Sequence, residues 1–254
     1  MKIARYRQDG SAAHGIVEGG DVYMASGDLF GGLTKGARVG SLDDVALDVP
    51  VVPGKIVAIG LNYAAHVTET DPTREAPTEP VIFMKPPSAL LPQGGVIALP
   101  PANRIDYEAE LCIVIGKRAS RVREAEAFDY VLGYTCGNDV SHRDQQAKDG
   151  QWVRAKGYDT FCPLGPWIET ELDPGNVAIQ SRLNGDVRQS SHTSDMIFNP
   201  AFLVSFVSNV MTLEPGDVIM TGTPEGVGPM QAGDTIEVEI EGIGTLRNTC
   251  KARD

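Results

Sequence analysis

Two glutamates, Glu108 and Glu110, stand two residues apart in the otherwise apolar stretch 106–116. In a β-strand, side chains two residues apart point to the same face, so these carboxylates would lie side by side. Like charges a few ångströms apart repel each other, and burial strengthens the repulsion. A divalent cation would relieve it, and carboxylate oxygens suit Mg²⁺, Mn²⁺ or Ca²⁺. The pair therefore indicates either a metal site or a strand face open to water.

A third carboxylate, Asp139, follows the apolar segment 131–136, where the end of a strand would present it. Arg143 and Gln146 are three residues apart and would share one face of a helical turn. The planar guanidinium of Arg143 could hold a substrate carboxylate. The alternative interpretation is an ordinary helix start, capped by Asn138 or by Asp139.

Three more segments carry groups that could react or bind. On a helix, Glu69 would orient His66 three residues before it and raise its basicity, which would make a general base near neutral pH. Lys156, flanked by glycine and aromatic residues, could stabilise an enolate or bind a carboxylate, although most lysines are simply solvated. Thr223 lies in the glycine-rich segment 216–228, which could form either an anion-binding nest or an ordinary turn.

Short apolar segments are expected to form the strands that position these residues. The expected strands are 2–6, 15–17, 22–24, 55–60, 81–85, 108–115, 131–136, 177–183, 218–221, 235–240 and 244–249. Helices are expected at 62–68, 123–128 and 199–211, the last with Phe202, Phe206 and Val210 as its apolar face. Strands and helices do not alternate regularly, which disfavours a doubly wound sheet or a TIM barrel. The sequence therefore predicts a mainly-β, α+β fold with few helices.

The 254 residues suffice for one large domain with a small partner. Residues 1–50 combine short β-like pieces with glycine-rich turns, and the prolines of segment 49–54 form a stiff connector. We therefore expect a small N-terminal domain at 1–50 and a catalytic domain at 51–254.

The charge and the apolar pattern limit the partners and the location. With 22 basic and 34 acidic residues the net charge is −12, whereas nucleic-acid or anionic-membrane binding needs a basic face. A local basic pocket is still compatible with this charge. No apolar run approaches membrane-spanning length and the N-terminus has no signal-peptide pattern, so a cytoplasmic protein is expected. The four cysteines form no C-x-x-C pair and are expected to be reduced.

Together, these segments resemble the fumarylacetoacetate hydrolase family, in particular its shorter acylpyruvase-like branch. The resemblance runs from about residue 55 to residue 254 and rests on the order and spacing of six motifs. They are N-Y-x-x-H-x-x-E (62–69), F-M-K-P-P (83–87), D-Y-E-A-E-L (106–111), N-D-V-S-x-R-D-x-Q (138–146), K-x-x-D-T-F-x-P (156–163) and T-G-T-P-x-G-V-G (221–228). One departure is His142, where many members carry a small residue, and it bears on specificity more than on the metal site.

The resemblance implies a roll of curled, mixed β-sheets that is usually dimeric, preceded by a small N-terminal domain. It implies that Glu108, Glu110 and Asp139 are the ligands of one Mg²⁺ or Mn²⁺. It also implies that Arg143, Gln146, Lys156 and Thr223 contact the substrate. His66 and Glu69 would form a catalytic dyad. The dyad would sit on a lid that orders when substrate binds, and the proline-rich insert 70–80 is expected to belong to that lid.

The expected activity is Mg²⁺-dependent hydrolysis of a C–C bond in short 2,4-dioxo acids such as fumarylpyruvate or acetylpyruvate. A 2-oxo acid chelates a hard cation, which then acts as an electron sink for the enolate that C–C cleavage leaves. Lys156 would add positive charge near that enolate, and His66 with Glu69 would deprotonate the attacking water.

The same site would also serve other enolate reactions. These are isomerisation of 2-hydroxyhepta-2,4-diene-1,7-dioate, decarboxylation of 5-oxopent-3-ene-1,2,5-tricarboxylate and decarboxylation of oxaloacetate. A non-catalytic metal- or acid-binding module is the hypothesis from another class, but it would have no need of a base. We expect a small-molecule substrate, a homodimer, and no nucleic-acid or membrane partner.

Overall fold

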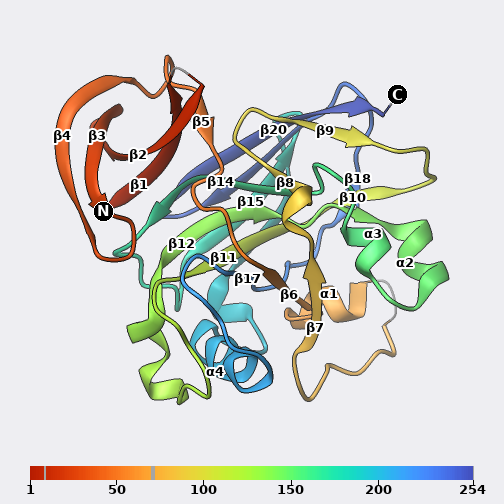
Figure 1. Ribbon diagram of the computed structural model, residues 1–254. Coiled ribbons are helices and arrows are strands. Elements are labelled where there is room, and N and C mark those ends of the chain that lie inside the picture. The colour runs from red at the N-terminus through yellow and green to blue at the C-terminus, as the bar shows by residue number, and fades with distance from the viewer. Residues whose placement is uncertain (9, 70–71, 254) are drawn as a thin grey trace.

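The computed structural model describes residues 1–8, 10–69 and 72–253, so the insert expected at 70–80 begins outside the described residues (Figure 1). Most elements are strands in mixed sheets, with a few short helices. The expected fold class, mainly β with few helices, is therefore confirmed. Among the described residues, no helix is both long enough and apolar enough to cross a membrane.

The largest sheet extends across the whole molecule (Figure 1). Strands from the first 50 residues continue into it, because β1 pairs with β14 through Lys2 opposite Glu169. Its main path, in spatial order, is β4 (Gly32–Ser41), β3 (Asp21–Asp28), β2 (Ser11–Glu18), β1 (Lys2–Gln8), β14 (Cys162–Glu169), β12 (Val131–Asn138), β11 (Ala109–Ile115), β17 (Val218–Met220), β6 (Ile56–Gly60) and β7 (Val81–Lys85). Off this path, β5 (Leu47–Asp48) pairs with β1 and β8 (Leu90–Leu91) pairs with β14.

Two smaller sheets complete the roll. One has the order β16 (Asp186–His192), β15 (Ala178–Leu183), β19 (Thr235–Ile240), β20 (Gly244–Ala252) and β9 (Val96–Leu99). The other has the order β13 (Ser141–His142), β10 (Ile105–Tyr107) and β18 (Gly228–Pro229). Strands β13 and β10 carry residues next to the candidate site, so this short sheet matters for function.

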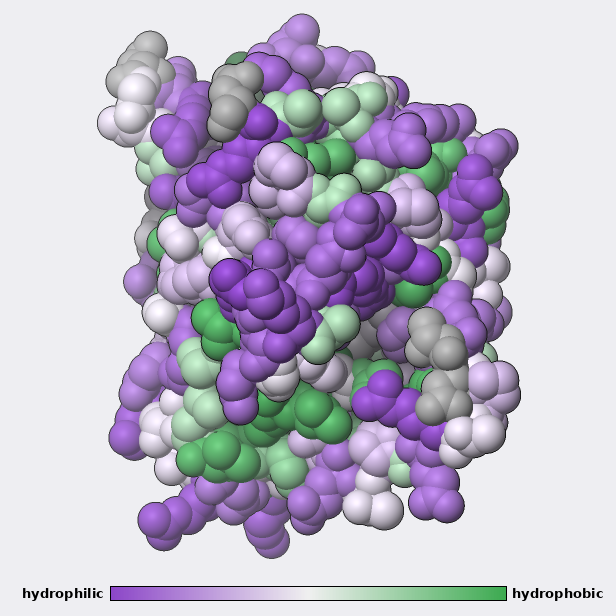
Figure 2. Space-filling model, turned by 90° about the vertical axis from the view of Figure 1, so that its right-hand side faces the viewer, coloured by the Kyte–Doolittle hydropathy of each residue, from purple (hydrophilic) through white to green (hydrophobic). Residues whose placement is uncertain are grey.

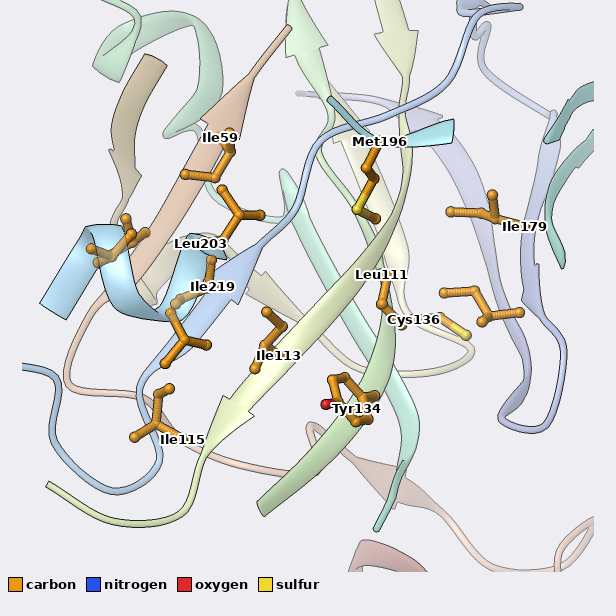
Figure 3. Packing of buried hydrophobic residues seen from close by; sticks show 14 of the residues in the cluster. Ile59, Leu111, Ile113, Ile115, Tyr134, Cys136, Ile179, Met196, Leu203 and Ile219 are labelled. Carbon is orange, nitrogen blue, oxygen red and sulfur yellow. The ribbon is translucent and has the colours of Figure 1, made fainter. Parts of the chain in front are cut away.

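Strand β11 forms the centre of the core because both of its faces are buried. Leu111, Ile113 and Ile115 point to one side, into the largest apolar cluster (Figure 3). Cys112 and Val114 point to the other side, into a second cluster. A strand that is covered on both faces appears in sequence as a continuous apolar run rather than an alternating one. The same alternation places Glu110 on the face of Cys112.

The helices are short and cover parts of the sheets. They are α1 (Ala64–Glu69), α2 (Arg143–Asp149), α3 (Val153–Lys156) and α4 (Pro200–Val210), with 3₁₀ helices η1 (Pro87–Ala89), η2 (Glu124–Tyr130) and η3 (Thr193–Asp195). The helix expected at 62–68 begins two residues later, and the one expected at 123–128 is 3₁₀. All four cysteines are buried and unpaired, as expected.

The apolar face expected for α4 is wrong. The helix buries Leu203, Val204 and Val207 against the core, and Val210 is 59% exposed. Phe202 and Phe206 are half-buried, and their rings stack on each other with centroids 6.0 Å apart. Helix α4 is apolar on two sides, and residue spacing alone does not say which of them meets the sheet.

Candidate metal and substrate site

Three buried carboxylates meet where β11 begins and β12 ends. Ala109 and Asn138 are partners in the antiparallel ladder, so the residues next to them in sequence are neighbours in space. One oxygen from each of Glu108, Glu110 and Asp139 lies within 4.8 Å of the others. All three residues are at most 4% exposed, which excludes the water-facing strand left open by the sequence. The structure therefore brings together the three predicted ligands.

Three basic side chains neutralise two of these carboxylates. The Lys156 ammonium donates to Glu108 Oε2 at 2.8 Å and to Asp139 Oδ2 at 2.7 Å. Arg143 Nη2 reaches Glu108 Oε1 at 2.7 Å. Lys85, fully buried at the end of β7, donates to the other oxygen of Asp139. Sequence reasoning missed Lys85, although a lysine that ends an apolar strand was a visible signal.

Glu110 is different, because no ion pair to it exists among the described residues. Its Oε2 accepts the backbone N–H of Gly222, at 2.8 Å. Burial, and then the charges of Asp139 and Glu108, raise the pKa of Glu110 well above its ordinary value. For Glu108, burial acts in the same direction, but Lys156 and Arg143 hold its pKa well below the usual range. Among the described residues, Glu110 has no basic side chain as a partner. Three buried carboxylates, one of them without such a partner, fit a hard divalent metal ion.

We expect the metal-free protein to lose stability as the pH rises, because of Glu110. Its raised pKa means that the folded chain keeps a proton that the unfolded chain releases above about pH 4.3. The free energy of unfolding then falls with pH, by at most about 1.4 kcal/mol per pH unit for one proton, until the folded carboxyl also ionises.

Urea unfolding with chelator, between about pH 5.5 and 7.5, checks this in the wild type and in Glu110→Gln. The amide cannot ionise, so in the variant the free energy of unfolding should lack the decrease with pH that Glu110 causes. Equal slopes in the two proteins would contradict the raised pKa.

The His66–Glu69 pair forms on α1 as expected from its spacing. His66 Nδ1 lies 2.9 Å from Glu69 Oε2. A carboxylate only accepts hydrogen bonds, so Nδ1 carries a proton, and in the neutral imidazole the lone pair is on Nε2. The other Glu69 oxygen accepts the backbone N–H of Gly226 at 2.8 Å, which ties the helix to the glycine-rich segment. The pair is thus oriented to act as a base through Nε2.

The glycine-rich segment binds carboxylates, but they belong to the chain itself. The N–H groups of Gly222 and Gly226 donate to Glu110 and Glu69. Gly222 has φ +95°, and a Cβ there would lie 2.7 Å from the Cβ of Asn62, so only glycine fits. The anion-nest interpretation therefore describes how the segment holds two site residues in place.

Helix α2 begins later than either cap expected from sequence. Its N-cap is His142, whose Nδ1 accepts from the N–H of Gln145. The proposed caps Asn138 and Asp139 are wrong, because β12 runs through Asn138 and the short strand β13 follows before the helix. His142 is buried and stacks on Tyr158 at 5.6 Å, so this departure from the family pattern serves packing and capping.

Two adjoining cavities join these groups into one site. The smaller, of about 30 Å³, is lined by the three carboxylates with Lys156 and Thr223. The larger, of about 460 Å³, is lined by Leu61, His66, Arg74, Arg104, Asp106, Arg143, Gln146, Ala147, Trp152 and Val227. Leu61, His66, Arg143, Gln146 and Trp152 line both.

The side of the molecule with α2 and α3 is mostly hydrophilic, with an apolar patch below (Figure 2).

The expected substrate contacts are partly engaged by neighbours. Arg143 Nη1 donates to Gln146 Oε1 at 2.8 Å, which fixes both side chains at the wall of the cavities. The Thr223 hydroxyl accepts from Gln189 Nε2 at 2.7 Å and keeps its own proton to donate. Every site residue predicted from sequence thus lies in or beside the two cavities. Arg74, Arg104 and Trp152 were not predicted.

Sequence and fold both resemble known proteins. Residues 55–251 match the fumarylacetoacetate (FAA) hydrolase C-terminal family, and residues 1–50 match the Rv2993c-like N-terminal family. A 2-hydroxyhepta-2,4-diene-1,7-dioate isomerase from Mycobacterium marinum is 43% identical, with a TM-score of 0.92 over 99% of this chain and 98% of that one. A 5-carboxymethyl-2-hydroxymuconate delta-isomerase from Mycobacterium smegmatis is 47% identical, with a TM-score of 0.92 over 100% of both chains. A mitochondrial oxaloacetate tautomerase from Xenopus laevis is 41% identical over 82% of this chain and 69% of that protein.

Proposed function

The chain belongs to the fumarylacetoacetate hydrolase family, and on this premise we propose that it is a divalent-metal-dependent hydrolase of a C–C bond. Its substrates would be short 2,4-dioxo acids of the acylpyruvate or fumarylpyruvate type. One observation carries the proposal: three buried carboxylates, Lys156 and the His66–Glu69 pair converge on two adjoining cavities. A protein that only binds a metal or an acid has no use for the oriented base.

Glu108, Glu110 and Asp139 would hold the cation, with Mg²⁺ or Mn²⁺ as the ions that suit three carboxylates. When bound, the cation supplies the positive charge that stabilises the enolate of a 2-oxo acid. Lys85 would keep Asp139 oriented through the oxygen that Lys156 does not contact. Such outer contacts are typical of metal ligands and fix their geometry.

The protein groups divide the hydrolytic step among them. His66 Nε2 takes a proton from a water molecule, and the water oxygen attacks the distal carbonyl carbon of the substrate. The C–C bond breaks, its electron pair stays on the pyruvate fragment as an enolate, and the other fragment leaves as a carboxylic acid. The buried Lys156 ammonium places positive charge beside that enolate. The proton that His66 took from the water then passes to the enolate carbon, which gives pyruvate and returns the imidazole to its neutral form.

Isomerisation of an unsaturated 2-oxo or 2-hydroxy diacid is the second candidate. It is supported by the high similarity to two proteins named as isomerases of such acids. The reaction moves a proton between two atoms of the substrate and needs no water. His66 would carry the proton, and the Lys156 ammonium would stabilise the enolate formed on the way. Decarboxylation or tautomerisation of oxaloacetate would use the same enolate chemistry.

A substrate panel with Mg²⁺ tests the proposal. The ultraviolet absorbance of fumarylpyruvate and acetylpyruvate falls on hydrolysis, and a 2-hydroxydiene-dioate and oxaloacetate run alongside. We expect Mg²⁺-dependent loss of the 2,4-dioxo acid absorbance with one equivalent of pyruvate formed. Loss of the diene signal without pyruvate would identify the isomerase instead. Bound metal with no change in any member of the panel would support a binding module.

We also propose that the protein is a homodimer, as its family resemblance implies. The net charge of −12 per chain opposes association, but salt at about 0.15 M screens charges beyond roughly 8 Å. Sedimentation at micromolar concentration should therefore give twice the chain mass of 27.2 kDa. A single species at the mass of one chain would refute the dimer.

A further inference from the structure

One side chain of strand β16 differs from its neighbours in the strand. The other residues of β16 are exposed or half-buried, but Gln189 is 0% exposed. A primary amide is costly to bury unless it is hydrogen-bonded, so a buried glutamine needs partners. Gly226 packs on the same part of the strand, because a Cβ there would lie 2.2 Å from the backbone oxygen of Arg188. The glycine-rich segment and Gln189 are therefore in contact.

The amide of Gln189 connects two segments of the candidate site. Its Oε1 accepts from the N–H of Ala109 at 3.0 Å, between two of the predicted metal ligands. Its Nε2 donates to the carbonyl oxygen of Pro224 at 2.8 Å and to the hydroxyl oxygen of Thr223 at 2.7 Å. A backbone N–H only donates and a backbone carbonyl only accepts, so the orientation of this amide is fixed.

The fixed amide decides what the Thr223 hydroxyl can do. An NH₂ group only donates, so Thr223 Oγ1 accepts from Gln189 and its own proton points elsewhere. Among the described residues, no atom accepts that proton. Thr223 is 3% exposed and lines the smaller cavity together with Glu108, Glu110 and Asp139. Its proton is therefore available to a ligand in that cavity.

We propose that Gln189 is a positioning residue, which holds the Thr223 hydroxyl so that it donates to the carboxylate of a bound 2-oxo acid. This inference rests on the proposed function, because it assumes that such an acid binds beside the three carboxylates. Gln189 lines neither cavity, so it acts through Thr223 and not by its own contact with the acid. Without the NH₂ group of Gln189, the hydroxyl is free to turn between its staggered positions.

Pyruvate, the 2-oxo acid that hydrolysis would release, tests this role without turnover. Its affinity is measured by calorimetric titration of the Mg²⁺-saturated protein. Thr223→Val removes the hydroxyl and should weaken binding about 10- to 100-fold, the range for a lost hydrogen bond to a charged group. Gln189→Met keeps the hydroxyl without its orientation and should weaken binding about three- to tenfold, because the hydroxyl must be ordered again when the acid binds.

A matched control makes the same change in the neighbouring strand of the same sheet. Gln180 lies in β15, opposite Ser190 of β16, and lines neither cavity. Gln180→Met should therefore bind pyruvate as the wild type does.

The double variant identifies the cause of the lost affinity. If Gln189 acts through the hydroxyl, Gln189→Met should cost nothing further once Thr223→Val has removed that hydroxyl. In Thr223→Ser, which keeps a hydroxyl, Gln189→Met should weaken binding as it does in the wild type. A double variant whose loss is the product of the two single losses would overturn the inference, because structural damage does not depend on the hydroxyl. Unchanged affinity in Gln189→Met, or no pyruvate binding by the wild type, would overturn it as well.

Gln189→Glu serves as a second variant if Gln189→Met does not fold. Its carboxyl group still accepts from the N–H of Ala109. It has at most one proton to donate, and that proton goes to Pro224, because a carbonyl oxygen can only accept whereas Thr223 can also donate. The hydroxyl is then no longer held as an acceptor. We expect weaker pyruvate binding, and no further loss in the Thr223→Val background. Wild-type affinity in Gln189→Glu would refute the positioning role.

Turnover separates this inference from the proposed function. With acetylpyruvate, Gln189→Met should raise KM and change kcat little, since the carboxylate contact exists before and during the reaction. If acetylpyruvate is hydrolysed while the two losses of pyruvate affinity are independent, the hydrolase stands and the positioning role is refuted. If no acid of the panel reacts but the two losses are coupled, the hydrolase is refuted and the positioning role stands. Thermal unfolding of each variant with Mg²⁺ confirms that the protein under test is folded.

Discussion

Replacing Glu110 by Gln should remove Mg²⁺-dependent activity while the fold is kept. The amide keeps an oxygen to accept from the N–H of Gly222, so the backbone around the site has no reason to move. It removes one of three negative charges and one of the predicted ligands. Bound metal ions contribute several kcal/mol to a reaction of this class, so kcat/KM should fall about 10³-fold or more.

Metal binding itself provides a second measurement for the same variant. Mg²⁺ should raise the unfolding temperature of the wild type and leave that of Glu110→Gln nearly unchanged, because a ligand stabilises only the state that binds it. Without metal, Glu110→Gln should be at least as stable as the wild type, since the wild-type chain must take up a proton at Glu110 on folding whereas the amide needs none. Glu126→Gln, the same change at a surface residue paired with Arg123, is the control. Full activity of Glu110→Gln under chelator-controlled Mg²⁺ would show that Glu110 is not a ligand.

The three carboxylates of the site were predictable because the patterns that indicate them lie within short segments of the sequence. Glu108 and Glu110 interrupt an apolar run at the two-residue period of a strand, and that pattern already requires either water or a cation. Asp139 follows a second apolar run directly. What the sequence does not contain is the pairing of β11 with β12, and that pairing decides whether the three carboxylates meet.

The basic part of the site was only partly predictable. Lys85 lies 54 residues from Asp139, and its role depends on β7 being brought to the site by the sheet. Arg104 and Asp106 are two residues apart and their ion pair is local, so their spacing was a usable signal that sequence reasoning passed over. Buried lysine and arginine side chains are hard to predict, because the sequence does not distinguish them from the far commoner solvated ones.

Two of the strands that the sequence did not predict, β14 and β16, have a compositional cause. Strand β14 contains two prolines and a glycine, residues that normally argue against a central strand, yet it lies between β1 and β12. Its pairing with β12 is irregular between Tyr134 and Cys136, which leaves room for residues without an N–H donor. Strand β16 is largely polar because it lies at the edge of its sheet. Local strand propensity therefore failed to predict β14 and β16.

His66→Ala should separate hydrolysis from decarboxylation. Hydrolysis of an acylpyruvate needs an attacking water, and general-base assistance contributes roughly 10²–10⁴ in rate. Decarboxylation of oxaloacetate needs no nucleophile. We therefore expect kcat for acylpyruvate hydrolysis to fall by that factor and kcat for decarboxylation to fall much less. Glu69→Gln should act in the same direction more mildly, because Glu69 orients the imidazole without taking the proton.

The position of His66 introduces a second effect that the kinetics must separate. Glu69 also holds the N–H of Gly226, so changes in this pair can loosen α1 from the glycine-rich segment and admit water to the cavity. Such loosening should raise KM for both substrates, whereas a lost base should lower kcat for hydrolysis alone. His192→Ala, at an exposed histidine that lines neither cavity, controls for the loss of an imidazole. If His66→Ala slows both reactions equally at unchanged KM, His66 serves a protonation common to both, and the water must be activated by another group.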